Sequence, residues 1–274
     1  MSNKLLLGVG GVAAVLILVL AGVLIMVAGG GGDEGDSKPN TTATEDNGDS
    51  GDNGDAASGE LRLRGEDPLF LDPAVAQDAG SALYIVEIFS GLVRLDKDLA
   101  IQPDLAESWD ISPDGTVYTF TLNQKATFQD GRPVTAEDVK YSFERALAPE
   151  TASVVAENFL GDIVGAKDVS RGRATELTGL KVVNDTTVQL TLDAPKVSFL
   201  YKMTYPAAFV VDRSQITANP KRWTQKPNGT GPYKLKEWKL GERIVLEAYD
   251  KHHLGAPTLK TVRYELQGGS ALIA

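Results

Sequence analysis

The chain has 274 residues and a formal net charge of −10, which is unevenly distributed because residues 29–60 hold nine acidic residues and a single base, Lys38. Beyond residue 60 there are 28 acidic and 25 basic residues, so this part lacks the basic surface that nucleic-acid binding requires. The sequence contains no cysteine, which excludes disulfides, thiolate catalysis and cysteine-ligated zinc.

Residues 5–28 form a run of 24 uncharged, mostly apolar residues after Lys4. As a helix this run would be about 36 Å long, enough to cross a hydrocarbon core about 30 Å thick. The base before it and the acidic residues after it predict a cytoplasmic N-terminus, with the following chain outside. Because signal-peptide cores usually span about 7–15 residues, we interpret residues 1–28 as an uncleaved signal anchor in the cell membrane, with a cleaved signal peptide as the alternative.

Residues 29–60 consist mainly of Gly, Asp, Ser, Asn and Thr. Such a segment buries too little apolar surface to offset the entropy of ordering it, so we predict a disordered acidic linker. Its Asp residues do not follow the spacing of a calcium-binding EF-hand loop, so no metal site is expected in it.

The remaining chain has the pattern of an α/β fold with mixed sheets. We predict strands at residues 61–64, 116–122, 187–193 and 259–266, and a hairpin over 233–250 that turns at Gly241-Glu242. Helices are predicted at residues 81–90 and 136–147, with a shorter one at 196–204. In the first helix Glu87 is expected to lie off the apolar stripe, and Gly91 to end the helix.

Two adjacent carboxylates, Glu137 and Asp138, precede the apolar stripe of the second helix and raise the question of a catalytic pair. Thr135 is a favourable N-cap, and its hydroxyl can accept from the Asp138 N–H while the Asp138 carboxylate accepts from the Thr135 N–H. The helix dipole favours the charged carboxylate at this end, whereas a general acid needs a raised pKa. We therefore interpret Thr135 and Asp138 as a structural helix cap.

The two histidines of the chain, His252 and His253, are adjacent. Neighbouring side chains point to opposite faces of a strand and lie about 100° apart on a helix. Neither geometry favours a two-histidine metal site, so we expect an exposed loop pair, with no metal and no cofactor.

The segment FQDGRPVTAEDVKYSFERAL resembles a signature of the bacterial extracellular solute-binding proteins, family 5, which include the oligopeptide- and dipeptide-binding proteins of ABC importers. Further similar segments follow the order of that family: LDPAVAQDAGSALYIVEIFSGLVRLD, IQPDLAESWDISPDGTVYTFTLNQKATFQDG, NFLGDIVGAKD, TGLKVVNDTTVQLTLDAP and GTGPYKLKEWKLGERIVLEAYD. Together they cover essentially all of residues 61–268.

The resemblance implies a type II periplasmic-binding-protein-like fold with an extra small lobe. Residues 61–89 and 209–265 would form part of the first lobe, and residues 90–208 an inserted small lobe. Residues 266–274 would begin a C-terminal lobe before which the chain is truncated.

In that family the loop after Asp72-Pro73 borders the ligand. At the crossing back into the first lobe, glycines indicate tight backbone geometry near the cleft. The ligand-binding residues that this implies here are Gln77, Asp78, Ala79, Ser81, Asn228 and Thr230. The alternatives are an exposed polar loop leading to a helix N-cap at Ser81, and a plain turn at the crossing.

The function implied is extracytoplasmic binding of a solute, oligopeptides being the expected class, and its delivery to the permease subunits of an ABC importer. The head would lie on the periplasmic or extracellular side of the membrane, and no bond would be made or broken. The alternative is a truncated, membrane-tethered interaction module that binds no solute. A hydrolase is disfavoured because the sequence has no nucleophile elbow and no Ser/His/Asp set.

Overall fold

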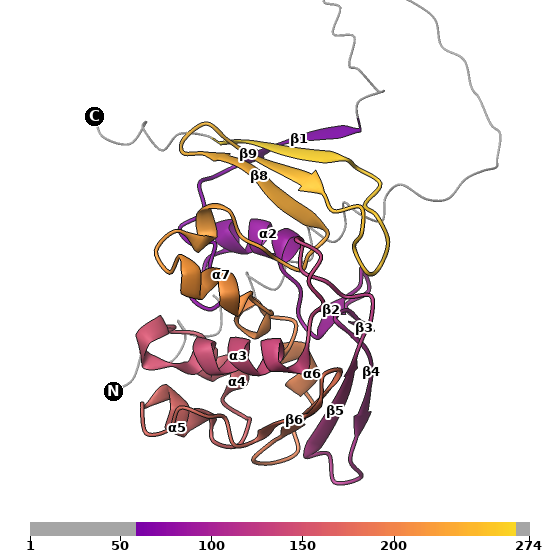
Figure 1. The fold of residues 1–274 in the computed structure, drawn as a ribbon, viewed down its shortest axis with the longest axis vertical. Coiled ribbons are helices and arrows are strands. Elements are labelled where there is room, and N and C mark those ends of the chain that lie inside the picture. Colours follow the sequence, from indigo (N-terminus) through magenta and orange to yellow (C-terminus); the bar gives the residue numbers. More distant parts are fainter. Residues whose placement is uncertain (1–58, 267–274) are drawn as a thin grey trace, which may run out of the picture.

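The computed structural model describes residues 59–266, which form two four-stranded sheets and a two-stranded ribbon with helices packed between and beside them (Figure 1). The first sheet has the strand order β1 (Glu60–Gly65), β10 (Thr261–Leu266), β9 (Arg243–Ala248), β8 (Tyr233–Lys239). The second has the order β4 (Ala106–Ile111), β5 (Val117–Leu122), β7 (Thr187–Thr191), β6 (Leu180–Asn184). The ribbon consists of β2 (Val93–Leu95) and β3 (Ile101–Pro103).

The first sheet is mixed, because β1 pairs with β10 in parallel whereas β10, β9 and β8 pair antiparallel. The first and last strands of the described chain therefore lie side by side. The β8–β9 hairpin turns at Gly241, whose φ of +70° lies in the left-handed region that favours glycine. Asp67 holds this turn, since its carboxylate accepts from the Gly241 N–H at 2.8 Å and from the Trp238 indole at 3.0 Å.

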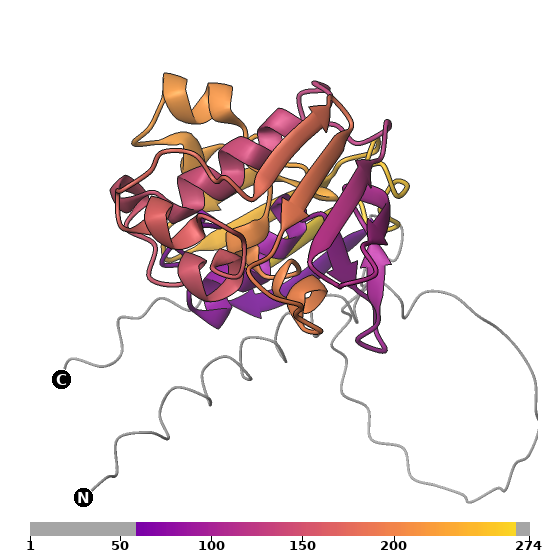
Figure 2. The same cartoon turned by 90° about the horizontal axis from the view of Figure 1, so that it is seen from below.

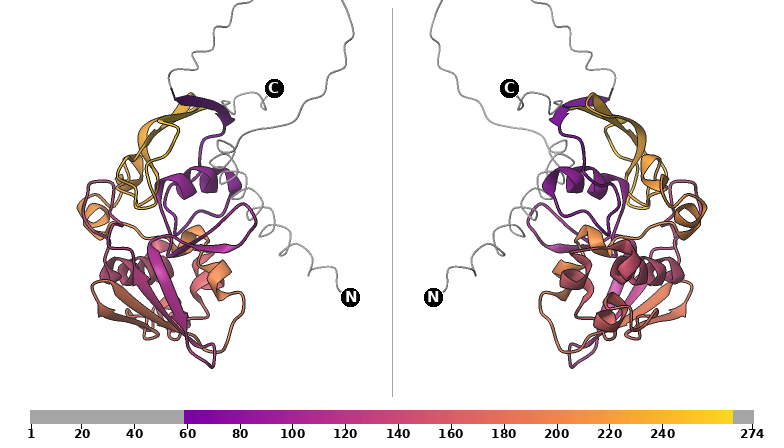
Figure 3. Two further views of the ribbon diagram at one scale, coloured as in Figure 1. Left: turned by 90° about the vertical axis from the view of Figure 1, so that its right-hand side faces the viewer. Right: turned by 90° about the vertical axis from the view of Figure 1, so that its left-hand side faces the viewer.

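Helix α2 (Ala79–Ile88) packs on the first sheet and lies between that sheet and the rest of the molecule (Figure 3). Its side chains Tyr84, Ile85 and Ile88 are completely buried. The Tyr84 ring meets the Tyr264 ring edge-on, with 4.9 Å between centroids. Burying a large apolar side chain stabilises the fold by about 1.5–3 kcal/mol, so α2 is a main attachment of the sheet.

The second sheet is entirely antiparallel, and helix α3 (Ala136–Leu147) packs against β6 and β7 (Figure 2). The apolar stripe of α3 is buried in the same cluster as the inward side chains of β5 and β7. The shorter helices are α4 (Ala156–Leu160), α5 (Ala166–Ser170), α6 (Phe199–Lys202) and α7 (Arg213–Ala218), and single 3-10 turns occur at Pro149–Thr151, Pro206–Ala208 and Trp223–Gln225.

Several predicted elements are confirmed, and the bounds of α3 are those predicted. Helix α2 begins two residues earlier than predicted, with Asp78 rather than Ser81 as its N-cap, and it ends at Ile88, three residues before Gly91. The prediction that Glu87 lies off the buried face is wrong. Both sides of α2 are covered near its C-terminal end, and Glu87 is only 9% exposed.

Strands β4 and β6 were not predicted, and both are edge strands of the second sheet. Apart from the first residue of each strand, Ala106 and Leu180, their residues are exposed or half-buried. An edge strand with so little burial does not need the alternation of apolar and polar residues that identifies a half-buried strand.

Buried apolar side chains form two clusters. One draws mostly on residues 92–210 and encloses the second sheet. The other draws on residues 71–89 and 209–266 and joins α2 to the first sheet. The chain passes from one cluster to the other near Phe89 and again near Phe209. The assignment of these parts as lobes of a ligand cleft stays a prediction.

The predicted anchor over residues 1–28, nearly all of the predicted linker, and residues 267–274 lie outside the described residues. Within residues 59–266, no helix combines the length and apolar character needed to span a bilayer.

Candidate functional site

The loop that leads into α2 is fixed by Asp72. Its carboxylate accepts from the Ala74 N–H at 3.0 Å, and its carbonyl accepts from the N–H groups of Val75 and Ala76. The Arg145 guanidinium of α3 contacts both carboxylate oxygens, at 3.0 and 2.5 Å. A bidentate Arg–carboxylate pair sets orientation as well as distance, so the loop is held in register with α3.

Four of the predicted ligand-binding residues lie where this loop becomes α2. Gln77 is exposed and Ala79 is the first residue of the helix. Asp78 is the N-cap, and its Oδ1 accepts from the Ser81 N–H at 2.7 Å. The other oxygen of Asp78, Oδ2, is buried and has no hydrogen-bond partner within residues 59–266. Ser81 is completely buried, and its hydroxyl accepts from the Phe70 N–H.

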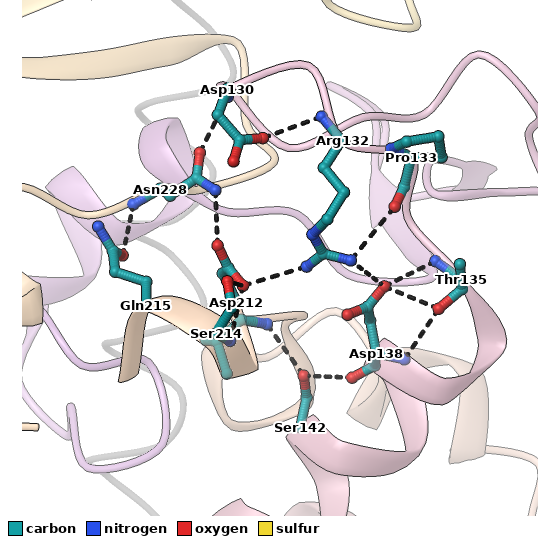
Figure 4. Close-up of polar contacts among 11 residues, drawn as sticks. Asp130, Arg132, Pro133, Thr135, Asp138, Ser142, Asp212, Ser214, Gln215 and Asn228 are labelled. Carbon is teal, nitrogen blue, oxygen red and sulfur yellow. Dashed lines mark hydrogen bonds and ion pairs between the residues drawn. The ribbon is translucent and has the colours of Figure 1, made fainter. Parts of the chain in front are cut away.

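The other two predicted residues lie where the chain returns to the first sheet. Asn228 uses its whole amide: Oδ1 accepts from the Asp130 N–H at 3.0 Å, and Nδ2 donates to Asp212 at 2.7 Å (Figure 4). Thr230 is completely buried, and its hydroxyl accepts from the Ser90 N–H at 2.9 Å. Both side chains hold the crossing in place, and direct contact with a ligand stays a prediction for them.

The structure does not bring these two groups together. Asp78 caps the N-terminus of α2, whereas Thr230 contacts the chain just beyond its C-terminus. A helix of ten residues is about 15 Å long, so the two groups are separated by roughly that distance.

The crossing itself lies directly against the end of α2. A Cβ atom on Gly229 would stand 1.9 Å from the Ile88 carbonyl oxygen, so only glycine fits there. Buried Gln129 completes the joint, because its amide donates to the carbonyls of Ile88, Gly231 and Tyr233. Sequence reasoning missed Gln129, since a single glutamine in a turn segment carries no periodic signal.

Arg132 is the centre of the ionic network drawn in Figure 4. Its Nη1 contacts Asp138 at 3.0 Å and its Nη2 contacts Asp212 at 3.1 Å, while the guanidinium lies 4.1 Å above the Phe128 ring centre. Burial alone would raise the pKa of Asp212, but hydrogen bonds from Ser214 and Asn228 together with the Arg132 charge hold it below its ordinary value. The network joins α3 to the start of α7.

Both hydrogen bonds of the expected capping box are present at the start of α3. The Asp138 N–H donates to the Thr135 hydroxyl at 3.4 Å, and the Asp138 carboxylate accepts from the Thr135 N–H at 2.9 Å. The same carboxylate oxygen also contacts Arg132. Asp138 is therefore occupied by structural contacts, which argues against a catalytic role for the Glu137–Asp138 pair.

Glu87 is a buried carboxyl that the sequence did not reveal. Burial raises its pKa to about 8, and its Oε2 has no hydrogen-bond partner in the described part of the chain. Its titratable neighbours include Tyr233 and Tyr264, and burial raises the pKa of Tyr233 to about 12. Glu87 is therefore mostly protonated at neutral pH.

The expectation of an exposed histidine pair is wrong. The loop between β9 and β10 folds back against the chain after β3, so that the side chain of His253 is only 1% exposed and contacts the Asp104 carboxylate at 2.9 Å. Burial lowers the pKa of His252 to about 3, with smaller contributions from His253 and Arg94. The argument from strand and helix geometry failed because both residues lie in an irregular loop.

Comparison with known proteins defines the class. The family model described as bacterial extracellular solute-binding proteins, family 5 (middle region), matches residues 100–271. The chain belongs to this family, as the sequence motifs predicted.

Individual relatives agree with that assignment. The chain is 35% identical over 204 residues to the periplasmic oligopeptide-binding protein OppA of Escherichia coli, covering 73% of this chain and 37% of the relative. It is 34% identical over 190 residues to the dipeptide-binding protein DppE of Bacillus subtilis, covering 68% of this chain and 35% of the relative. The solved structure of the Escherichia coli murein tripeptide binding protein MppA superposes with a TM-score of 0.71 at 32% identity, covering 76% of this chain and 42% of that one. The chain thus spans little more than a third of the length of these curated relatives.

Proposed function

We propose that this chain acts in an extracytoplasmic solute-binding protein of an ABC importer, with oligopeptides as the solute class and the permease subunits as its partners. The observation that carries the proposal is the family match over residues 100–271, with the shared fold in support. Two relatives named for oligopeptide and dipeptide binding are 35% and 34% identical to it.

The proposed mechanism is capture between lobes. A receptor of this kind gains affinity when its lobes close on the ligand, because closure excludes water and adds contacts from both sides. We assign residues 61–89 and 209–265 to the first lobe, residues 90–208 to a small inserted lobe and residues 266–274 to the start of a facing lobe. Residues 1–28 would anchor the head to the cell membrane through the linker over residues 29–60.

Within the first lobe, we assign direct ligand contact to the loop before α2. Gln77 is exposed, and the buried Oδ2 of Asp78 is a hydrogen-bond acceptor without a partner in residues 59–266. Ala79 would contribute its backbone. Ser81, Asn228 and Thr230 would have to exchange their present hydrogen bonds to reach a ligand, so their main part in the proposal is to position the loop and the crossing.

The test is a thermal-unfolding screen of the full chain against pools of di- to pentapeptides. A ligand that binds only the folded state raises Tm, by an amount that grows with ligand concentration over Kd. The Asp78→Asn variant is informative because Asn and Asp are equally good N-caps, so that the change removes the charge and keeps the helix start. Asp98→Asn, at an exposed carboxylate, is its control.

A Tm rise that is retained in Asp98→Asn and reduced in Asp78→Asn supports both the peptide assignment and the loop. No rise with any pool counts against peptide binding by these 274 residues and favours the tethered interaction module. A rise that Asp78→Asn leaves unchanged keeps the function but removes Asp78 from the site.

A further inference from the structure

A cluster of three metal-ligating side chains lies away from the loop before α2. Asp104 follows β3, and His252 and His253 lie in the loop between β9 and β10. Each offers one ligand atom, and these atoms all lie within 4.8 Å of one another. The side chains of His253 and Asp104 are 1% and 9% exposed, and His252 is half-buried, so the cluster is largely shielded from solvent.

Two imidazole nitrogens of this cluster make no hydrogen bond within the described residues. His252 Nε2 and His253 Nδ1 are both buried and have no hydrogen-bond partner within residues 59–266. A buried polar atom without a partner typically costs about 1–3 kcal/mol, so two in adjacent residues call for an explanation. Imidazole nitrogens beside a carboxylate are a donor set that a metal ion would satisfy.

We propose that Asp104, His252 and His253 form a binding site for a divalent transition-metal ion of the zinc type. Two nitrogen donors and one oxygen donor suit Zn²⁺, Ni²⁺, Co²⁺ or Cu²⁺, whereas Ca²⁺ and Mg²⁺ prefer sites made of oxygen atoms. Three protein ligands around a tetrahedral ion leave the fourth position to water.

The geometry requires a small adjustment on binding. Ligands about 2.0–2.2 Å from a tetrahedral ion are about 3.4 Å apart, so a pair of ligand atoms in the cluster must close by at most about 1.4 Å. Rotation of the His252 ring, in an irregular loop, can supply this. Arg94 is close enough to oppose a cation, while the Asp104 carboxylate offsets it, so we expect binding of moderate strength.

The consequence would be a cross-link between the two parts of the molecule. Asp104 lies between strands that join the larger apolar cluster, and the β9–β10 loop belongs to the first sheet. Tyr249, in the same loop, already bridges the two parts. Its hydroxyl lies 2.7 Å from the Thr127 hydroxyl and donates to the Phe128 carbonyl. A bound ion would strengthen this junction independently of whether a peptide is bound.

The experiment is isothermal titration of the full, tag-free chain with Zn²⁺, in the wild type and in His252→Ala and Asp104→Asn. Glu107→Gln is the matched control, because Glu107 is an exposed carboxylate three residues from Asp104. We expect one Zn²⁺ per chain in the wild type and in Glu107→Gln, and at least tenfold weaker binding in the other two variants. No Zn²⁺ binding to the wild type, or equal binding in all four proteins, would overturn the proposal.

X-ray absorption of the Zn²⁺-loaded wild type keeps the test decisive if a variant fails to fold. The chain has only two histidines, so imidazole scattering around the zinc can come only from His252 and His253. A coordination shell made of oxygen alone would place the ion elsewhere, for example on the acidic residues 29–60, and would refute the site. Neither readout involves a peptide, so failure here leaves the proposed function standing.

Discussion

The buried carboxyl of Glu87 makes stability depend on pH in a way that a single substitution should remove. Its pKa is about 8 in the folded protein against an ordinary value of 4.5. The folded state therefore binds more protons than the unfolded state between these two values, and stability falls as pH rises through this window. Below pH 4.5 the carboxyl is neutral in both states and contributes no penalty.

The size of the stability penalty follows from the pKa shift of Glu87. A gap of about 3.5 pH units corresponds to a full penalty of about 5 kcal/mol above pH 8, of which about 3 kcal/mol is already present at pH 7. Glu87→Gln replaces the carboxyl by a neutral group of the same shape. The variant should match the wild type near pH 4.5 and exceed it by about 3 kcal/mol at pH 7.

Urea unfolding of both proteins between pH 5 and pH 8.5 measures this difference. The neighbouring Tyr233 does not interfere, because its pKa of about 12 keeps it protonated throughout. Exposed Glu107→Gln should leave the pH dependence of the wild type unchanged. If the Glu87→Gln curve runs parallel to the wild-type curve, the carboxyl is hydrated or partnered and the reasoning fails.

Two further substitutions test the joint between the two parts, and a third tests the N-cap of α3. Gly229→Ala should lower the free energy of unfolding by about 3 kcal/mol, because the added Cβ would meet the Ile88 carbonyl at 1.9 Å. Arg132→Ala should cost about 2 kcal/mol, since it leaves Asp212, only 3% exposed, without its cationic partner. Thr135→Ala should cost about 1 kcal/mol through loss of the helix cap. Urea unfolding at pH 7 measures all three.

Matched controls separate these effects from general sensitivity to mutation. Gly80→Ala adds a Cβ whose nearest neighbour is 3.3 Å away, and Arg171→Ala removes an exposed guanidinium. Both should stay within about 1 kcal/mol of the wild type. If Gly229→Ala were as stable as Gly80→Ala, the close approach of the crossing to α2 would be wrong. If Arg132→Ala were as stable as Arg171→Ala, the ionic network around Arg132 would make no measurable contribution to stability.

The sequence predicted best where local chemistry determines the structure. Helix α3 was placed to the residue because an N-cap, a reciprocal carboxylate and a 3.6-residue apolar stripe all lie within one segment. The mixed sheet could be expected from alternating strands, but the edge strands β4 and β6 carry no such alternation. Which residues pack against an edge strand or a loop is determined by segments that are distant in the sequence.

In the candidate site, too, the features that the sequence missed depend on contacts between residues far apart along the chain. Asp78 was singled out through the family resemblance and Thr230 through the glycines of the crossing, but the length of α2 separates them. The Glu87 carboxyl lies near Tyr233 on β8 and Tyr264 on β10, far away in the sequence. The burial of His253 depends on Asp104, which is also distant, and no local pattern could have indicated either contact.

We propose that the chain takes part in peptide binding, and isothermal titration of the full chain with individual di- to pentapeptides is the measurement closest to this proposal. We expect saturable binding of at least one peptide that weakens in Asp78→Asn and persists in Asp98→Asn. Absence of measurable heat and of any Tm change across the whole peptide series would refute this prediction and would favour the alternative of an interaction module that binds no solute.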